Sequence, residues 1–345
     1  MFERSIGHRY DDPVDLIWVR AAADLGLKVV RSKDAFASYD GKGTLTIAEE
    51  SDFDADDCLA QMIFHEICHW LIAGRRGKLL EDWGLSNVDE SDLVYEYAAI
   101  RLQAALSRPY GLRPFMAVTT DWRPYWESLP EDPLLDGDDP AILLAQDGHF
   151  LSRRQPFEAV LKRALSATAA IADAVRSSTE ASSLWSVTRA RHRLGSLLSD
   201  ANDQKCGDCA WSILEDSRLA CRQHKGFDEA APKVEATEQA CEKWEPKFSI
   251  EDCGSCGACC REGFDLLTVT ADDPFKQLHP ELVQLRDDGS HCVPRPDGIC
   301  VALDGDGATT PYRCRHYENR PKNCGHFEVG GDGCLQARRR VGLSR

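Results

Sequence analysis

The sequence predicts an α+β protein, with a mostly helical N-terminal part that carries a small sheet and an irregular, cysteine-rich part after it. Several segments before residue 200 place apolar residues at helical spacing, and only Cys58 and Cys68 lie among them. The other 13 of the 15 cysteines fall between Cys206 and Cys334, among many Gly, Pro and Asp residues. We expect this second part to be held together largely by bound metal.

The elements of the N-terminal part follow from helix and turn signals. A first helix, 13–26, opens with a proline and closes at a glycine, and a second, 54–73, has acids in its first turn and a glycine after its end. Short strands are expected from Val29 and over 44–47. Residues 108–140, rich in Pro, Asp and Trp, are expected to be irregular. Further helices are expected over 91–106, 156–176 and 184–199, the last two forming a hairpin.

The charge balance excludes some partners. The chain has 41 Lys+Arg against 57 Asp+Glu, a net charge of −16, which would repel nucleic acid. Its apolar runs fall short of the roughly 18 residues that a bilayer span needs, and its start lacks the apolar core of a signal peptide. We therefore expect a cytoplasmic protein that binds neither nucleic acid nor membrane. Cytoplasmic cysteines are metal ligands or redox groups more often than structural disulfides.

The first chemical motif is His65-Glu66-Ile67-Cys68-His69. Residues four apart lie on one face of a helix, so His65 and His69 can bind one metal ion, zinc or iron, with Glu66 beside it as a general base. Apolar neighbours on both sides set this polar face apart from a chance match on an amphipathic helix. Cys68 is expected to pack in the core.

A catalytic site of this type needs a third protein ligand. Glu96 is the candidate, because it is a carboxylate inside an otherwise apolar helix. The alternatives are that Glu96 faces solvent, or that Glu81, Asp82 or Glu90 is the ligand instead.

This segment resembles two families. The His-Glu-x-x-His helix and the later Glu-x-x-Ala helix look like zincin metallopeptidases, which implies a zincin-like fold with His65, His69 and Glu96 as ligands and Glu66 as general base. The run 65–76, followed by Asp82-Trp83-Gly84, is similar to elongation factor P hydroxylase, a metal-dependent lysine hydroxylase. The aromatic residues that follow in that family are replaced here by Leu85-Ser86-Asn87. The resemblance spans about 20 residues, so its substrate does not carry over.

The second motif is Cys253-Gly-Ser-Cys256-Gly-Ala-Cys259-Cys260. With the runs 300–303 and 314–324, it resembles the YkgJ-like CxxCxxCC family, described as a zinc- or iron-chelating domain. The resemblance covers about 250–345 and implies the ligand set Cys253, Cys256, Cys259, Cys260, Cys300, Cys314, Cys324 and Cys334. Eight thiolates could form two four-sulfur sites, or one cluster and spare thiols. Cys292 is not among the eight cysteines of this CxxCxxCC hallmark. Arg320-Pro321 is expected to form a rigid turn whose Arg faces the metal-bound thiolates.

Between the two motifs lies a third group, Cys206, Cys209, Cys221 and Cys241. Four cysteines suffice for one zinc ion or one iron–sulfur cluster, and His224 could replace one of them. The alternatives are free thiols or ligands shared with the downstream residues. For the C-terminal motif, three cysteines at intervals of three with a remote fourth favour iron–sulfur over zinc.

These motifs divide the chain into a metal-dependent catalytic domain (1–150), a helical hairpin or linker (151–200), a middle segment (201–249) and a C-terminal segment (250–345). Three functions are compatible with them. We favour an enzyme that oxidises or hydroxylates a protein or peptide substrate, with the Cys-rich part or a redox partner supplying electrons. The second is a zinc peptidase with a structural or substrate-docking Cys-rich module. The third is a metal-chelating protein without turnover, for which Glu66 has no use.

Overall fold

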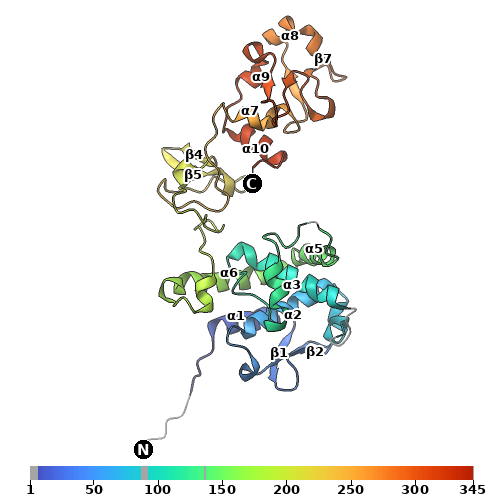
Figure 1. Cartoon of the computed structure of the whole chain (residues 1–345), viewed down its shortest axis with the longest axis vertical. Helices are drawn as coiled ribbons and strands as arrows, with labels where there is room; N and C mark the ends of the chain where they lie inside the picture. The colour runs from blue at the N-terminus through green and yellow to red at the C-terminus, as the bar shows by residue number, and fades with distance from the viewer. Residues whose placement is uncertain (1–6, 87–91, 136, 345) are drawn as a thin grey trace, which may run out of the picture. The chain divides into compact units, whose positions relative to one another are not determined.

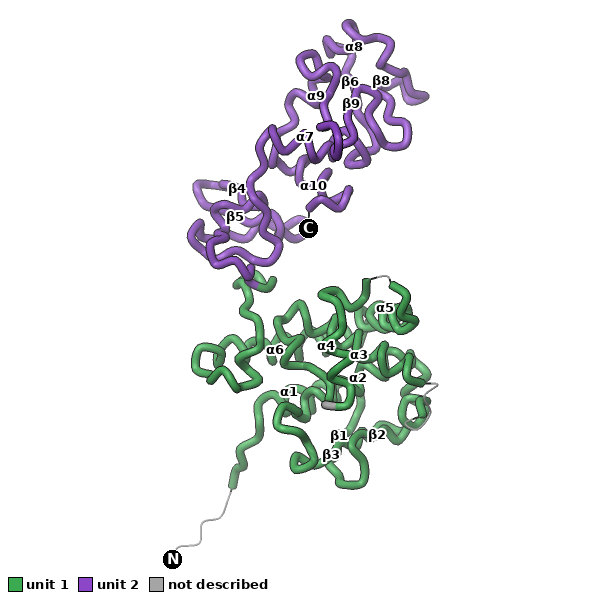
Figure 2. Tube along the Cα trace, viewed as in Figure 1, with its two compact units in different colours: residues 1–197 green, residues 198–345 purple. Residues whose placement is uncertain are grey.

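The computed structural model describes residues 7–86, 92–135 and 137–344, and it divides into two compact units, residues 1–197 and 198–345 (Figure 2). Unit 1 is mainly helical with one small sheet, and unit 2 consists of short strands and short helices joined by irregular chain (Figure 1). The predicted α+β class is therefore confirmed. The finer division into four functional parts stays a prediction.

Unit 1 has six helices and three strands among its described residues. The helices are α1 (Pro13–Asp24), α2 (Leu59–Ala73), α3 (Leu93–Ser107), α4 (Arg123–Ser128), α5 (Ala141–Ser152) and α6 (Phe157–Val175). The strands are β1 (Lys28–Ser32), β2 (Ala37–Tyr39) and β3 (Thr44–Ala48). Strand β3 lies in the centre of the sheet, parallel to β1 and antiparallel to β2.

Helix α2 forms the centre of unit 1 and contacts α1, α3 and α5 (Figure 1). Most of its residues are buried, including Phe64, whose ring lies 4.7 Å from that of Trp18 on α1. The Trp18 indole N–H donates to the Thr168 hydroxyl on α6. Complete burial of a side chain such as Phe64 contributes about 1.5–3 kcal/mol to stability. The helix that carries both histidines of the first motif is thus fixed on several sides.

The predicted helices and strands of unit 1 are largely found, with several differences. Helix α2 begins at Leu59 and not near residue 54, because the Gln61 side chain caps the backbone N–H of Cys58. The sequence did not predict helix α5 or strand β2, and helix α4 lies within residues 108–140, which were expected to be irregular. The helix predicted over 184–199 is wrong, and with it the helical hairpin that it was expected to form: only 184–187 forms a single 3-10 turn, and Gly195 has a positive φ of 98°.

Unit 2 has little regular structure. Its helices are α7 (Cys253–Cys256), α8 (Pro274–Leu278), α9 (Lys322–Gly325) and α10 (Asp332–Arg340). Its strands are β4 (Ser212–Glu215), β5 (Arg218–Cys221), β6 (Leu267–Val269), β7 (Gln284–Leu285), β8 (His291–Val293), β9 (Leu303–Asp304) and β10 (Arg313–Cys314). They form the hairpins β4–β5 and β9–β10 and a sheet of order β6-β8-β7.

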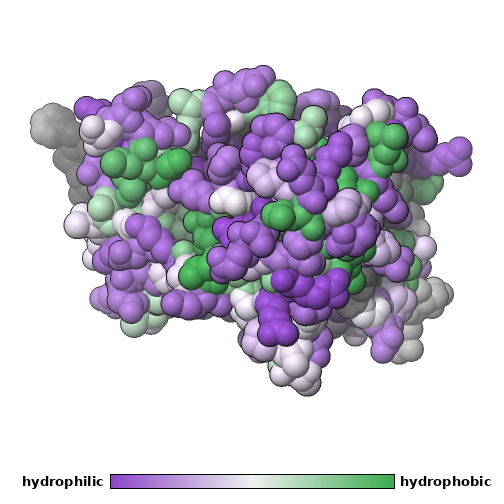
Figure 3. All heavy atoms as spheres, turned by 90° about the horizontal axis from the view of Figure 1, so that it is seen from above, coloured by the Kyte–Doolittle hydropathy of each residue, from purple (hydrophilic) through white to green (hydrophobic). Residues whose placement is uncertain are grey.

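The visible surface in Figure 3 is mostly hydrophilic, with hydrophobic residues in small scattered groups. Among the described residues, no helix combines the length and the apolar character that crossing a membrane requires.

Candidate metal sites

The two histidines of the first motif meet the predicted third ligand in unit 1. His65 and His69 lie on α2, and Glu96 lies in the first turn of α3. The Nε2 atoms of His65 and His69 are 3.0 Å apart, and each is 3.1 Å from one oxygen of the Glu96 carboxylate. Three potential ligand atoms from two packed helices therefore surround one point. This arrangement suits a metal ion with three protein ligands and open positions.

The rival third ligands are placed differently. The Asp82 carboxylate accepts the backbone N–H of Tyr39 at 2.7 Å, and Glu81 pairs with Asp40 through its backbone. Glu90 lies outside the described residues. Cys68 is fully buried in the core, as predicted.

Gln103, which the sequence analysis did not select, orients His65. Its Nε2 donates to the Met116 carbonyl at 2.8 Å, so its Oε1 faces the Nδ1 of His65 at 2.8 Å. An amide oxygen can only accept, so His65 carries its hydrogen on Nδ1 and presents Nε2 to a metal. Gln103 lies seven residues after Glu96 on α3, which places both on one helix face. A buried glutamine two turns after a candidate ligand is the signal that could have identified it.

The charges at this site are strongly coupled. Burial lowers the pKa of His65, but Glu96, with Glu66 and Gln103, outweighs burial and raises that pKa to about 9. Burial raises the pKa of Glu96, but the two histidines outweigh it and hold the pKa well below its ordinary value. Without metal, a proton on His65 therefore offsets the Glu96 charge. A cation that binds here would displace this proton.

Glu66 is buried beside the histidines and is held by Trp83. The Trp83 indole N–H donates to Glu66 Oε2 at 2.7 Å. Trp83 has a positive φ of 62° and stacks on Tyr39 with 3.9 Å between ring centroids. A bulky residue in this backbone region is rare and strained, so the surrounding packing must hold it there. One carboxylate oxygen of Glu66 is thus fixed by the indole.

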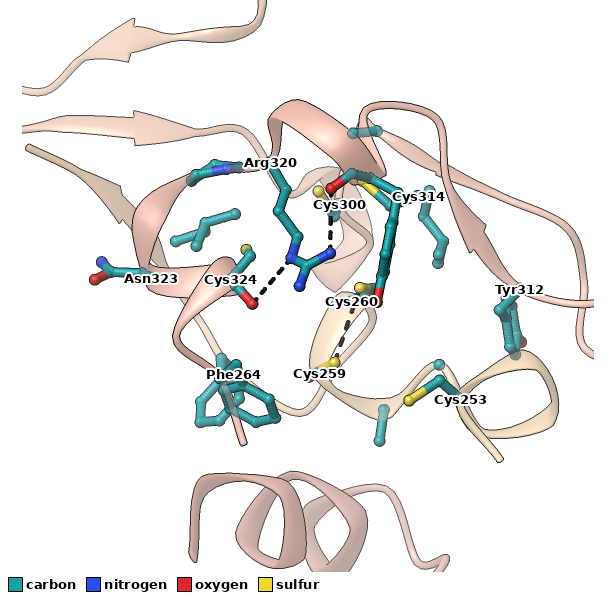
Figure 4. Close-up of a pocket in the computed structure, with 18 of the residues that line it drawn as sticks. Cys253, Cys259, Cys260, Phe264, Cys300, Tyr312, Cys314, Arg320, Asn323 and Cys324 are labelled. Carbon is teal, nitrogen blue, oxygen red and sulfur yellow. Dashed lines mark hydrogen bonds between the residues drawn. The ribbon is translucent and has the colours of Figure 1, made fainter. Parts of the chain in front are cut away.

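The eight cysteines of the CxxCxxCC hallmark line one cavity of about 760 Å³ in unit 2. They come from all over the C-terminal segment: Cys253 and Cys256 from α7, Cys259 and Cys260 from the turn after it, Cys300 before β9, Cys314 from β10, Cys324 from α9 and Cys334 from α10. Figure 4 shows several of these sulfurs around the cavity, with Arg320 reaching between Cys324 and Cys314. Cys292 is buried in β8 and does not line the cavity.

Gly257 allows the chain to turn between Cys256 and Cys259 of the second motif. Its φ is 58°, and a Cβ at this position would lie 2.5 Å from the Tyr312 ring. Only glycine avoids both the strain and the clash. The turn places Cys256 at the end of α7 and starts the short 3-10 helix that carries Cys259 and Cys260.

The eight thiols fall into two neighbourhoods, according to which cysteines affect the pKa of which others. Cys253 and Cys334 are influenced by Cys256 and Cys259. The second neighbourhood joins Cys260, Cys300, Cys314 and Cys324. Cys259 also influences Cys324, and its sulfur is 3.9 Å from that of Cys260, so the two neighbourhoods meet at this pair.

Positive charge lies close to these thiols. Burial raises the pKa of Cys324 to about 12, and the Arg320 guanidinium opposes this rise. Arg320 donates to the Cys324 and Tyr317 carbonyls at 3.3 and 3.1 Å. The hydrogen bond from Cys260 lowers the pKa of Cys259 to about 7, and Arg295 acts in the same direction. Eight cysteines around one cavity, whose thiols lose their protons when they bind metal, suit zinc or iron centres with guanidinium groups nearby.

The middle segment brings its four cysteines near one another. Cys206, Cys209 and Cys241 are buried, and Cys221 is half-buried at the end of β5. The pKa of Cys206 is raised to about 12, mainly by burial and then by the nearby Glu238, Cys209, Cys221 and Cys241. The His224 Nε2 lies 3.9 Å from the Cys241 sulfur.

Residues 252–338 match the family model CxxCxxCC, described as "Putative zinc- or iron-chelating domain". This match supports zinc or iron binding by the C-terminal segment. Comparisons with curated proteins and with solved structures give no match. They lend no support to the resemblance of the N-terminal part to zincins or to elongation factor P hydroxylase. The comparisons therefore support metal binding by the cysteines of the C-terminal segment.

Proposed function

We propose that this protein is a metalloenzyme in which unit 1 binds one iron ion through His65, His69 and Glu96 and oxidises or hydroxylates a protein or peptide. The observation that carries the proposal is the convergence of two imidazole nitrogens and one carboxylate on a single point. Two histidines and one carboxylate with open positions are the ligand set of non-haem iron oxygenases.

The C-terminal segment supports oxidation over hydrolysis. Hydroxylation with dioxygen follows R–H + O₂ + 2e⁻ + 2H⁺ → R–OH + H₂O, so it needs two electrons from a reductant. A thiolate-bound iron–sulfur centre at the eight-cysteine cavity can relay such electrons from a cellular reductant. A hydrolase has no use for them. The presence of this domain in the same chain therefore favours the oxidative reaction.

The residues of unit 1 have distinct roles in this proposal. When bound, the iron supplies oxygen activation. His65 and His69 would hold it through their Nε2 atoms, and Gln103 keeps the hydrogen of His65 on Nδ1. The Trp83 indole holds Glu66 by Oε2, so Oε1 is the oxygen that would accept or donate a proton beside the site.

A zinc peptidase is the second candidate, because the same position of Glu66 suits deprotonation of a metal-bound water. In that case Glu66 would be the general base, and the Cys-rich residues would be structural or would dock the substrate.

The test begins with protein purified without oxygen, in which iron, zinc and acid-labile sulfide are measured per chain. We expect iron with sulfide, one iron fewer in His65→Ala, and oxygen uptake by protein that has been reduced and then freed of excess dithionite, which His65→Ala and Glu66→Gln reduce at least tenfold. His8→Ala, which changes an exposed histidine, is the matched control. Zinc without sulfide, together with cleavage of casein that Glu66→Gln abolishes, would establish the peptidase instead.

A further inference from the structure

The four cysteines of the middle segment, three of them buried, lie in a shell of chain that the family match does not cover. Three backbone bridges draw the stretches 198–209 and 239–246 together around them: Lys205 pairs with Gln239, Leu198 with Cys241, and Cys209 with Pro246. The hairpin β4–β5, turned by Asp216 and Ser217 with positive φ values, brings in Cys221.

We infer that Cys206, Cys209, Cys221 and Cys241 bind one further metal ion, of the tetrahedral zinc type, and that this site anchors the helix that carries Cys334. Structural zinc sites are closed and use four protein ligands, which matches a shell with three buried thiols. The larger cavity of the C-terminal segment has room for more than a single ion. The inference does not depend on the activity proposed for unit 1.

A short chain of contacts links this shell to α10. Arg222 directly follows Cys221, and its guanidinium donates to the Gly330 carbonyl and to Asp332, both at 2.9 Å. Cys334 lies two residues after Asp332. The position of Arg222, and with it the start of α10, therefore depends on how Cys221 is held.

The packing around α10 continues this link. Leu335 is 1% exposed and shares a hydrophobic cluster with Cys209 and Trp211 of the middle segment. The guanidinium of Arg339 lies 4.0 Å from the Trp211 ring centroid. Metal at the middle site would rigidify one side of this cluster, and the residue next to Leu335 is Cys334. We expect loss of the middle metal to loosen Cys334 in the cavity wall.

The experiment compares metal-loaded wild-type protein with Cys206→Ser/Cys209→Ser and with Arg222→Ala. Metal content is measured by elemental analysis, and alkylation of Cys334 and Cys314 by iodoacetamide is followed by mass spectrometry. The double variant should hold one metal ion fewer per chain and alkylate Cys334 at least tenfold faster, with Cys314 unchanged. Arg222→Ala should keep the metal and still expose Cys334. Arg218→Ala, an exposed arginine on the same hairpin, should match wild type in both respects.

Unchanged metal content in the double variant would overturn the metal site. Loss of the metal with unchanged alkylation of Cys334 in both variants would overturn the anchoring role. If the double variant does not fold, Cys241→His, which keeps a metal-binding atom, provides the test. A chelator should remove one metal ion from it at least tenfold faster than from wild type, and equal rates would contradict the site.

Discussion

The Oε1 atom of Gln103 lies 2.8 Å from Nδ1 of His65, and the other end of the same amide is fixed on the Met116 carbonyl. This pair sets which nitrogen of His65 is available to a metal. It joins α3, which also carries Glu96, to the histidines of α2.

Gln103→Leu should weaken metal binding at the His65 site by about 10- to 100-fold, because groups that orient a ligand contribute this much to affinity. It should also cost about 1–3 kcal/mol of stability, since Nδ1 and the Met116 carbonyl lose their partner. Titration against a competing chelator and urea unfolding measure the two effects. Gln146→Leu, which removes a similar bond to the Leu134 carbonyl, should lower stability and leave the affinity unchanged.

Trp83→Phe should keep the stack on Tyr39 and remove the hydrogen bond to Glu66. We expect full metal content and at least a tenfold loss of turnover, because a carboxylate that is no longer fixed transfers protons less effectively. Elemental analysis and oxygen uptake, or peptide cleavage for the peptidase, measure the two. A loss of metal instead would show that Trp83 supports the ligands and not Glu66.

Metal binding at His65 should strengthen as pH rises. The pKa of His65 without metal is raised to about 9, so the site is protonated at pH 7 and metal must release that proton. The apparent affinity should increase about tenfold per pH unit from 7 to 9 and level off above 9. Calorimetry in buffers of different ionisation enthalpy, with the thiol sites already loaded, counts the released proton. A flat profile would contradict the coupling between Glu96 and His65.

Arg320→Gln should reduce metal retention by the C-terminal segment, because the Arg320 charge opposes the burial that raises the pKa values of Cys324 and Cys314. Arg320→Lys should restore part of the loss. The measurement is the rate of metal release to a chelator at pH 7. Arg286→Ala removes an exposed arginine near Asp288 and should release metal at the wild-type rate. Equal release from Arg320→Gln would rule out this role.

The sequence by itself predicted the α+β class, most helices of unit 1 and the cysteine hallmark that the family model matches. These features depend on local signals: apolar spacing, caps and fixed intervals between cysteines. The placement of His65 and His69 on one helix face could also be predicted, because it needed only that this stretch be helical. The helix expected over 184–199 does not form, although its apolar residues have helical spacing. Only one 3-10 turn forms there, and Gly195 takes a positive φ.

Only the tertiary structure decided which residues meet across elements. It selected Glu96 as the carboxylate at the histidines and placed Gln103 and Trp83 behind them. It gathered eight thiols from six places along the C-terminal segment around one cavity and left Cys292 in a strand. Such contacts depend on how α2 packs on α3 and on how loops far apart in sequence close around a site. The spacing of residues along the chain does not contain that information, because many packings share the same local pattern.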